Sequence, residues 1–383
     1  MSAPLIPPPL TLYVHYPWCV RKCPYCDFNS HTQRTVDDAA YFAALLRQLE
    51  QTLPLIWGRH IHALFFGGGT PSLMPPEALA DFLSQARALL GFGAEVEVTL
   101  EANPGTAEAE KFAAFRVAGV NRLSVGVQSF DDRQLQTLGR IHSAAEAHAA
   151  LDMVRAAGFD NFNIDLMFAL PGQTVGDALA DLEAALAHAP THLSHYQLTL
   201  EPNTPFYRQP PPGLPDDDVA TEIQQACAAR LQAAGFEHYE VSAWAQPGRA
   251  CRHNLNYWRY GDYIGLGAGA HGKLTLAQRN EILRTQMPAS PGAYVAEIER
   301  GGMGRQHSVP LTERPFEYML NRLRLFEPFA LAEFEAVTGV SREVVLPTLN
   351  ALQEKGLLVQ QNDAWTLTEQ GQAFLNDVIE AFL

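Results

Sequence analysis

Six short apolar segments alternate with helical patterns through the first 200 residues, and this alternation limits the fold more than any other feature of the sequence. Several of these segments are almost continuously apolar, as parallel strands are when helices cover their sheet. The predicted strands span residues 11–16, 61–66, 95–101, 122–127, 161–167 and 193–199. Six β/α units in series predict an α/β fold, a partial (β/α)6 barrel, and the loss of the pattern after residue 200 argues against a full eight-unit barrel.

Sequence patterns typical of helices lie between these predicted strands. Residues 37–53 carry an apolar stripe, and Pro75-Pro76-Glu77 has the composition of a helix start. Gly119 and Gly158 stand where helices of the series should end. The spacing of these signals supports the β/α assignment.

The pattern changes beyond residue 200. A proline-rich loop, a helical segment, an alternating strand and a stretch rich in glycine and aromatic residues follow at 202–218, 217–234, 238–244 and 251–272. We therefore expect three domains, a partial barrel, a barrel extension and a C-terminal domain, at residues 1–200, 201–311 and 312–383.

The C-terminal segment has the element order of a winged helix: three helices, a strand pair at 357–359 and 364–367, and a last helix. Residues 312–383 carry 5 basic and 11 acidic side chains, a net charge of −6, and the whole chain has a net charge of −15. Phosphate backbones attract Lys and Arg, so this charge argues against a nucleic-acid partner. We expect a winged-helix-like lid or partner-docking domain.

The sequence shows neither a membrane-spanning segment nor a signal peptide. No stretch reaches the roughly 18 consecutive apolar residues of a transmembrane helix. Residues 1–10 are rich in proline and lack the basic-then-apolar order of a signal peptide. We expect a cytoplasmic protein without a transmembrane segment.

Three cysteines, Cys19, Cys23 and Cys26, follow the first predicted strand with the spacing C-x3-C-x2-C. Three thiolates on one loop can hold three irons of a 4Fe–4S cluster, which usually has four cysteine ligands, so the fourth iron stays open to a ligand that is not protein. A zinc site would need a fourth Cys or His nearby, and disulfides need an oxidising compartment. Zinc and a chance grouping of reduced cysteines remain alternatives.

Glycines and polar residues recur where the predicted strands end. Gly67-Gly68-Gly69-Thr70 follows the second strand, and Glu101, Gln128 and Asp165 belong to the ends of the next three. Glycines let a backbone approach a ligand closely, and side chains at the carboxyl ends of barrel strands meet at one mouth. Each of these residues taken alone is as often a capping or surface group. Together they predict a ligand site beside the cysteines.

The segment 13–28 and the glycine turn together resemble the radical S-adenosylmethionine (radical SAM) superfamily. In that family the open iron binds the amino and carboxylate groups of SAM, and the cluster delivers one electron that breaks a C–S bond and yields a 5′-deoxyadenosyl radical. The resemblance implies a radical SAM barrel. It also implies a set of SAM contacts: Tyr13, Gly68, Gly69, Thr70, Glu101, Gln128, Arg140 and Asp165.

The whole chain resembles the oxygen-independent coproporphyrinogen III dehydrogenase family and its heme chaperone branch, in segments 124–130, 138–142 and 165–173. The dehydrogenases carry a further cysteine two residues after the third, where this chain has Phe28. The chaperones carry H-N-x-x-Y-W, which here is 253–258. Both features favour the chaperone branch, and oxidative decarboxylation of coproporphyrinogen III is the alternative.

The segment 253–258 also has a direct physical interpretation. An imidazole can be an axial ligand of heme iron, and aromatic rings can pack on a macrocycle. We therefore expect His253, Tyr257 and Trp258 to contact heme, with Arg252 and Arg259 near its propionates. A lone His beside aromatic residues is more often a hydrogen-bonded core residue, so that alternative stays open.

The expected cofactors are thus a 4Fe–4S cluster, SAM and heme, on a scaffold capable of SAM cleavage. The expected partners are heme, an electron donor and acceptor hemoproteins, for which the membrane surface is one meeting place. His271 and Cys251 are further candidates for the iron ligand. Cys227, in an apolar helical pattern, is expected to be a core thiol.

Overall fold

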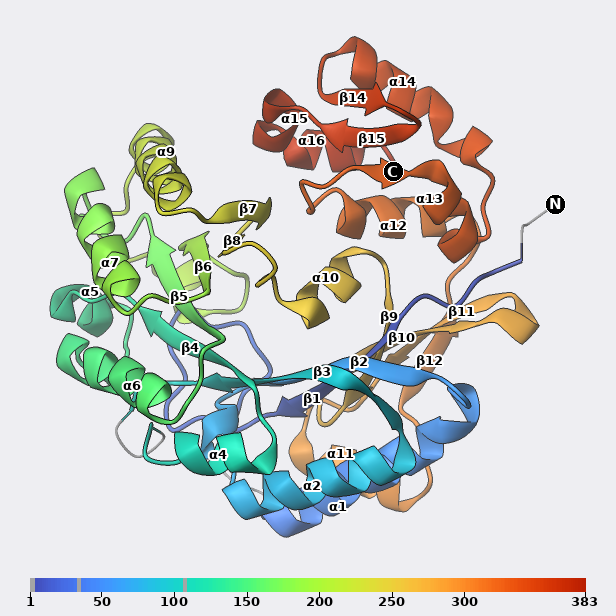
Figure 1. The fold of residues 1–383 in the computed structure, drawn as a ribbon, viewed down its shortest axis with the longest axis horizontal. Coiled ribbons are helices and arrows are strands. Elements are labelled where there is room, and N and C mark those ends of the chain that lie inside the picture. The colour runs from blue at the N-terminus through green and yellow to red at the C-terminus, as the bar shows by residue number, and fades with distance from the viewer. Residues whose placement is uncertain (1–3, 33–35, 106–108) are drawn as a thin grey trace.

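The computed structural model describes residues 4–32, 36–105 and 109–383. Residues 1–3, where the predicted first domain begins, lie outside the described residues. Within these ranges one sheet has the strand order β12-β11-β10-β9-β1-β2-β3-β4-β5-β6-β8-β7, and a smaller sheet has the order β13-β15-β14. Figure 1 shows the large sheet curving with helices along its outer face, and the C-terminal segment packed beyond α10.

The first six strands of the large sheet run parallel in sequence order: β1 (Leu10–Tyr16), β2 (His60–Gly68), β3 (Gly91–Ala102), β4 (Arg122–Gln128), β5 (Phe162–Phe168) and β6 (His192–Gln197). Each overlaps a predicted strand. β9 (Asp262–Leu266) pairs in parallel with the other side of β1. The sheet order ends in two edges, so the predicted partial barrel is confirmed.

Antiparallel strands extend the sheet at both ends: β7 (Glu237–Glu240), β8 (Ala243–Ala245), β10 (His271–Leu276), β11 (Glu281–Gln286) and β12 (Arg305–Ser308). The prediction of one strand over 238–244 is wrong, because β7 and β8 form a hairpin. Glu240 pairs with Ala243 across a two-residue connection. Cross-strand partners lie on the same face of a sheet, whereas residues three apart in one strand lie on opposite faces, so the apolar–polar alternation over 238–244 did not reflect a single strand.

Helices follow most of the parallel strands: α1 (Asp38–Thr52), α2 (Pro76–Leu89), α4 (Phe112–Ala118), α5 (Asp132–Thr137), α6 (Ala144–Ala156), α7 (Val175–Ala187), α8 (Pro205–Arg208), α9 (Asp217–Ala233), α10 (Arg252–Trp258) and α11 (Pro291–Glu299). Short 3-10 turns occupy Leu53–Leu55, Pro71–Leu73, Ala277–Arg279 and Arg342–Val344. Asp37 caps α1 by accepting from the Ala40 amide, and Gly119 ends α4 with a φ of 113°. The end at Gly119 was predicted from that residue, and the cap at Asp37 stands at the start of the predicted helical segment 37–53.

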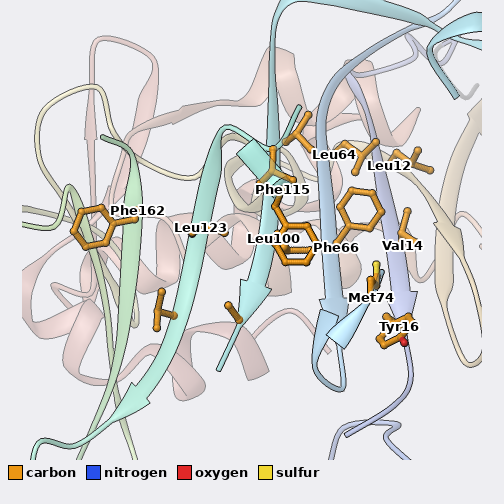
Figure 2. Close-up of a cluster of buried hydrophobic side chains, with 14 of the residues drawn as sticks. Leu12, Val14, Tyr16, Leu64, Phe66, Met74, Leu100, Phe115, Leu123 and Phe162 are labelled. Carbon is orange, nitrogen blue, oxygen red and sulfur yellow. The ribbon is translucent and has the colours of Figure 1, made fainter. Parts of the chain in front are cut away.

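The main core lies between the sheet and its outer helices, where alternate residues of the strands are buried. Figure 2 shows Leu12 and Val14 of β1 beside Leu64 and Phe66 of β2, and the same cluster continues to Leu123 on β4. Burying each such side chain contributes about 1.5–3 kcal/mol. The intervening residues of these strands face the barrel interior, which leaves that interior for polar and functional groups.

The C-terminal segment contains α12 (Arg314–Arg322), β13 (Phe329–Ala330), α13 (Leu331–Thr338), α14 (Leu346–Glu354), β14 (Leu358–Gln361), β15 (Ala364–Leu367), α15 (Glu369–Ala373) and α16 (Leu375–Glu380). This matches the predicted winged-helix-like order, with β13 as an added third strand. Its apolar cluster, around Trp365 and Tyr318, also takes in Leu5, Tyr260 and Ile282. In the described ranges no helix has the length and apolar character needed to cross a membrane.

Candidate functional site

A cavity of about 140 Å³ lies at the carboxyl ends of the parallel strands. Its lining includes all three cysteines of the predicted triad. It also includes every residue expected to contact SAM except Tyr13: Gly68, Gly69, Thr70, Glu101, Gln128, Arg140 and Asp165. Residues separated by about 100 positions are thus brought to one mouth, because the ends of parallel strands meet there.

The glycine turn after β2 is packed directly against the cysteine loop. The amide of Gly69 donates to the carbonyl of Tyr16 at 2.8 Å. A Cβ on Gly69 would lie 2.6 Å from the Trp18 carbonyl oxygen, and one on Gly68 would lie 2.6 Å from the ring of His15. Gly68 also has a φ of 117°. Only glycine satisfies both the close approach and this backbone conformation.

The three cysteine thiols are free and half-buried. Thr70 Oγ1 donates to the sulfur of Cys19 at 3.5 Å, and Arg140 Nη1 donates to the sulfur of Cys23 at 3.8 Å. Burial raises the pKa of the Cys26 thiol. Metal ions bind the thiolate, so a bound cluster would have to supply the positive charge that favours its deprotonation.

This donor set fits a cluster with one open iron. Cys227 and Cys251 are fully buried and do not line the cavity, so the cavity offers three thiols. Among the described residues no three His, Cys, Asp or Glu groups gather as ligands of a single ion. A cubane does not require such convergence, because each thiolate binds a different iron. Cys227 belongs to the main apolar cluster, as predicted for a core thiol.

Two carboxyl groups, Glu101 and Asp165, line the cavity. Burial, followed by the nearby Asp165, raises the pKa of Glu101 to about 8. Its Oε2 accepts from the Gly68 amide at 3.1 Å. Burial also raises the pKa of Asp165, which accepts from the Asn163 amide group at 2.7 Å. A cationic ligand, or one that donates hydrogen bonds, would favour ionisation of both groups.

A chain of hydrogen bonds connects the cavity wall to the cysteines. Arg140 donates to Asn103 Oδ1 at 2.7 Å, and Asn103 donates to Thr70 Oγ1 at 2.9 Å. Gln128 has a φ of 73°, a strained conformation for a residue with a side chain, and its Oε1 accepts from the Tyr196 hydroxyl at 2.6 Å. The strand irregularity at Gln128 thus turns its amide toward the cavity.

Several cavity residues were missed from the sequence: Tyr25, Asn103, Ser124 and Tyr196. Asn103 and Tyr196 follow or end strands, so the rule that selected Glu101 could have found them. Tyr13 is the one expected SAM residue outside this lining. Its hydroxyl donates to Nδ1 of His15 at 2.9 Å, inside the barrel.

The helix α10 occupies the barrel interior toward the amino ends of the strands, across from α12 (Figure 1). Glu97 of β3 accepts from the Arg252 amide at 2.9 Å, and so satisfies a free donor at the start of α10. Asn256 donates to Thr11 Oγ1 at 3.2 Å. These bonds hold α10 against β1 and β3.

The side chain of His253 points into the barrel interior and is 8% exposed. Its ring centroid lies 5.1 Å from that of Phe65 and 6.2 Å from that of Tyr13. Burial lowers the pKa of His253 to about 4, so the ring is neutral. Within the described residues its Nε2 is buried without a hydrogen-bond partner. The ring is enclosed by aromatic residues.

The other heme candidates lie apart from the cysteine cavity. Tyr257 and Trp258 are half-buried and contact each other edge to face at 5.0 Å. Cys251 is buried with its sulfur 3.5 Å from Glu97 Oε1, and His271 is exposed at the start of β10. The structure does not bring these residues to the cysteine cavity.

This chain is similar to known proteins in both sequence and structure. Residues 13–185 match the Radical SAM superfamily model, and residues 309–374 match the HemN C-terminal domain model. Two proteins named heme chaperone HemW, from Haemophilus influenzae and Escherichia coli, are each 46% identical over 98% of this chain and 98% of their own length. The structure of E. coli coproporphyrinogen III oxidase (HemN) matches with a TM-score of 0.81 and 23% identity, over 98% of this chain and 90% of that one, and so shares the fold.

Proposed function

The chain belongs to the heme chaperone HemW family of radical SAM proteins, and from that premise we propose that it binds heme and delivers it to acceptor hemoproteins. The family relation covers nearly the whole chain, including the cysteine loop, α10 and the C-terminal segment. The expected acceptors, an electron donor and a meeting place at the membrane surface are parts of the same proposal.

The presence of Phe28 favours this proposal over the dehydrogenase alternative. Its side chain lines the cysteine cavity and is 60% exposed. The resemblance places a further cysteine here in the dehydrogenases. A benzyl group can neither ligate a metal nor transfer a hydrogen atom as a thiol can. The chain therefore lacks one reactive group in the position where that reaction would use it.

The cysteine cavity is proposed to hold the cluster and SAM. A bound cluster would supply single electrons to SAM. Cys19, Cys23 and Cys26 would hold it, and the turn Gly68 to Thr70 would receive the amino end of SAM. Glu101 and Asp165 would accept hydrogen bonds from the ligand, which explains why two carboxyl groups with raised pKa values line one cavity.

Contact of His253, Tyr257 and Trp258 with heme stays a prediction. In this structure the ring of His253 is enclosed between Tyr13 and Phe65, so direct ligation by His253 requires α10 to move. The half-buried Tyr257 and Trp258 lie closer to the surface.

The test is a hemin titration of anaerobically purified, cluster-reconstituted protein, with and without SAM, followed by absorbance. We expect saturable binding and transfer of the heme to an apo-hemoprotein such as apomyoglobin. A parallel assay supplies coproporphyrinogen III, SAM and a reductant under the same conditions. Robust decarboxylation in that assay, without heme binding, would replace the chaperone proposal with the dehydrogenase.

A further inference from the structure

Two histidines and a carboxyl group meet on the outer side of the barrel, away from the cysteine cavity. His148 and Asp152 belong to α6, and His188 is the first residue after α7. Figure 1 shows both helices outside the sheet, beside β4 and β5. None of the three residues lines the cysteine cavity, and the proposed chaperone function gives them no role.

Ring nitrogens of the two histidines face each other. Nδ1 of His148 lies 2.8 Å from Nε2 of His188, and Oδ1 of Asp152 lies 3.3 Å from Nδ1 of His188. An ionised carboxylate can only accept a hydrogen bond, so Nδ1 of the neutral His188 ring carries the proton and its Nε2 keeps a lone pair. That lone pair is directed at the second imidazole.

One face of α6 holds the turn that follows α7. His148, Asp152 and Arg155 stand four and three positions apart, so they project from the same side of the helix. Nη2 of Arg155 donates to the carbonyl of His188 at 2.6 Å and to that of Ala189 at 3.0 Å. The backbone of His188 is therefore fixed by the helix that carries His148, and the pair is arranged before any ligand arrives.

The ring of Phe130 packs against the pair, which is open to solvent on another side. Its centroid lies 4.7 Å from that of His148 and 6.5 Å from that of His188. The side chain of His188 is 11% exposed, His148 is half-buried and Asp152 is exposed. Burial is the main cause that lowers the pKa of His188, so this ring is neutral near pH 7 and available to a cation.

The hydrogen bond between the two rings uses only part of what they offer. Two facing imidazole nitrogens share a single proton, whereas a metal ion accepts a lone pair from each. With Zn–N bonds of about 2.0–2.1 Å, two nitrogens on a tetrahedral ion lie about 3.3 Å apart, which is about 0.5 Å more than the 2.8 Å found here. A small rotation of the half-buried His148 side chain supplies that difference.

Asp152 gives the pair a further property of metal sites. A histidine that binds a metal through one nitrogen usually donates its other N–H to a carboxylate, as Nδ1 of His188 does to Asp152. The carboxylate also offsets the charge of Arg155, which by itself would repel a cation. Imidazole donors suit Zn²⁺, Ni²⁺ and Cu²⁺, whereas Mg²⁺ and Ca²⁺ prefer oxygen.

We propose that Nδ1 of His148 and Nε2 of His188 bind a divalent transition-metal ion, with Asp152 orienting His188 and water completing the coordination. The ion ties α6 to the end of α7. Two imidazoles are its protein ligands, so the site does not need the convergence of three groups that is absent from the described residues. This inference is independent of the proposed chaperone function.

The test is a calorimetric titration of Zn²⁺ into anaerobic, cluster-reconstituted protein. Zn²⁺ has no redox chemistry, and the cluster keeps the cysteine thiols occupied. We expect one micromolar site in the wild type. His148→Gln and His188→Gln should each weaken it by about tenfold or more, because one of two ligands is lost. Asp152→Asn keeps both ligands and should weaken it by about threefold or more.

Matched controls separate this site from other imidazoles. His307→Gln removes an exposed imidazole on β12 and should bind Zn²⁺ like the wild type. Zn²⁺ should raise the melting temperature of the wild type but not that of His148→Gln, and Mg²⁺ should raise neither. Melts without metal show whether His188→Gln is folded, and His148→Gln, on the surface of α6, decides the matter if it is not.

Two results would overturn the assignment. Equal Zn²⁺ affinity in the wild type, His148→Gln and His188→Gln would place the ion elsewhere on the chain. A wild type that binds Zn²⁺ no more tightly than millimolar would leave the pair as a hydrogen bond between two structural side chains. Loss of the site in both histidine variants, with retention in His307→Gln, is the result that supports it.

Discussion

The cysteine cavity and the helix α10 lie toward opposite ends of the same parallel strands. They differ in how well their buried polar groups are paired. In the cavity, Glu101 and Asp165 are held with raised pKa values and Gln128 has a strained backbone. Around α10, the donors of Arg252 and Asn256 have partners on the strands. A site prepared for a ligand leaves electrostatic demands unmet, whereas a packed element satisfies them.

His253 and Trp258 are exceptions in the second region, since the Nε2 of His253 and the Nε1 of Trp258 are buried without a hydrogen-bond partner among the described residues. The helix α10 is therefore either a structural element beside the ligand site or a part of that site. Four experiments would sharpen or break the distinction.

The largest effect is expected at the cysteines. Cys23→Ala should abolish the cluster, because three thiolates are the minimum that the cavity offers, while anaerobic reconstitution of the wild type should give about four irons per chain. Cys227→Ala, which changes a core thiol, is the control and should keep its iron. Iron analysis and absorbance measure both, and an intact cluster in Cys23→Ala would contradict the assignment.

The next effect is expected at Asp165. Removing its carboxylate deprives the ligand of a buried hydrogen-bond acceptor, at a cost of roughly 1–3 kcal/mol, so Asp165→Ala should weaken SAM binding by about tenfold or more. Calorimetry on the reconstituted protein measures the affinity. Asp152→Ala changes a carboxylate with 75% side-chain exposure and should bind SAM normally. Equal affinities in the two variants would remove Asp165 from the SAM site.

The stability of the cluster-free protein should depend on pH through Glu101. Its pKa is about 8 in the fold against 4.5 ordinarily, so the folded state keeps a proton that the unfolded chain has released. The free energy of unfolding should therefore fall as the pH rises from about 4.5 to about 8. Urea unfolding at several pH values measures this slope. Glu101→Gln should flatten it, and Glu222→Gln, on the exposed side of α9, should leave it unchanged.

The smallest effect is expected for His253→Phe. Phenylalanine fits beside Phe65 and Tyr13 and removes an unpartnered nitrogen, so His253→Phe should stay within about 1 kcal/mol of wild-type stability or exceed it. His253→Ala leaves a void and should lose about 2–4 kcal/mol. Urea unfolding measures both. If His253→Phe is stable yet loses hemin with a shifted Soret band, α10 belongs to the heme site and is not only a packed structural helix.

Much of the cavity could be predicted from the sequence because its residues obey local rules. The cysteines sit on one loop, and Glu101 and Gln128 mark the ends of apolar runs. Tyr196 obeys the same rule, but the predicted strand ran to residue 199, whereas β6 ends at Gln197. Tyr13 was carried over from the family resemblance, and its direction toward His15 depends on how β1 packs against the turn after β2.

By itself, the sequence determined the parallel strands, their order along the chain, the helix caps and the cysteine loop, since each depends on periodicity or on contacts between near neighbours. Only the tertiary structure decided that 238–244 is a hairpin, that His253 faces into the barrel, and that the rings of His148 and His188 face each other. Those outcomes depend on which surfaces meet after the chain has folded. Residues 148 and 188 are neither close in sequence nor part of one repeating pattern, so nothing local could pair them.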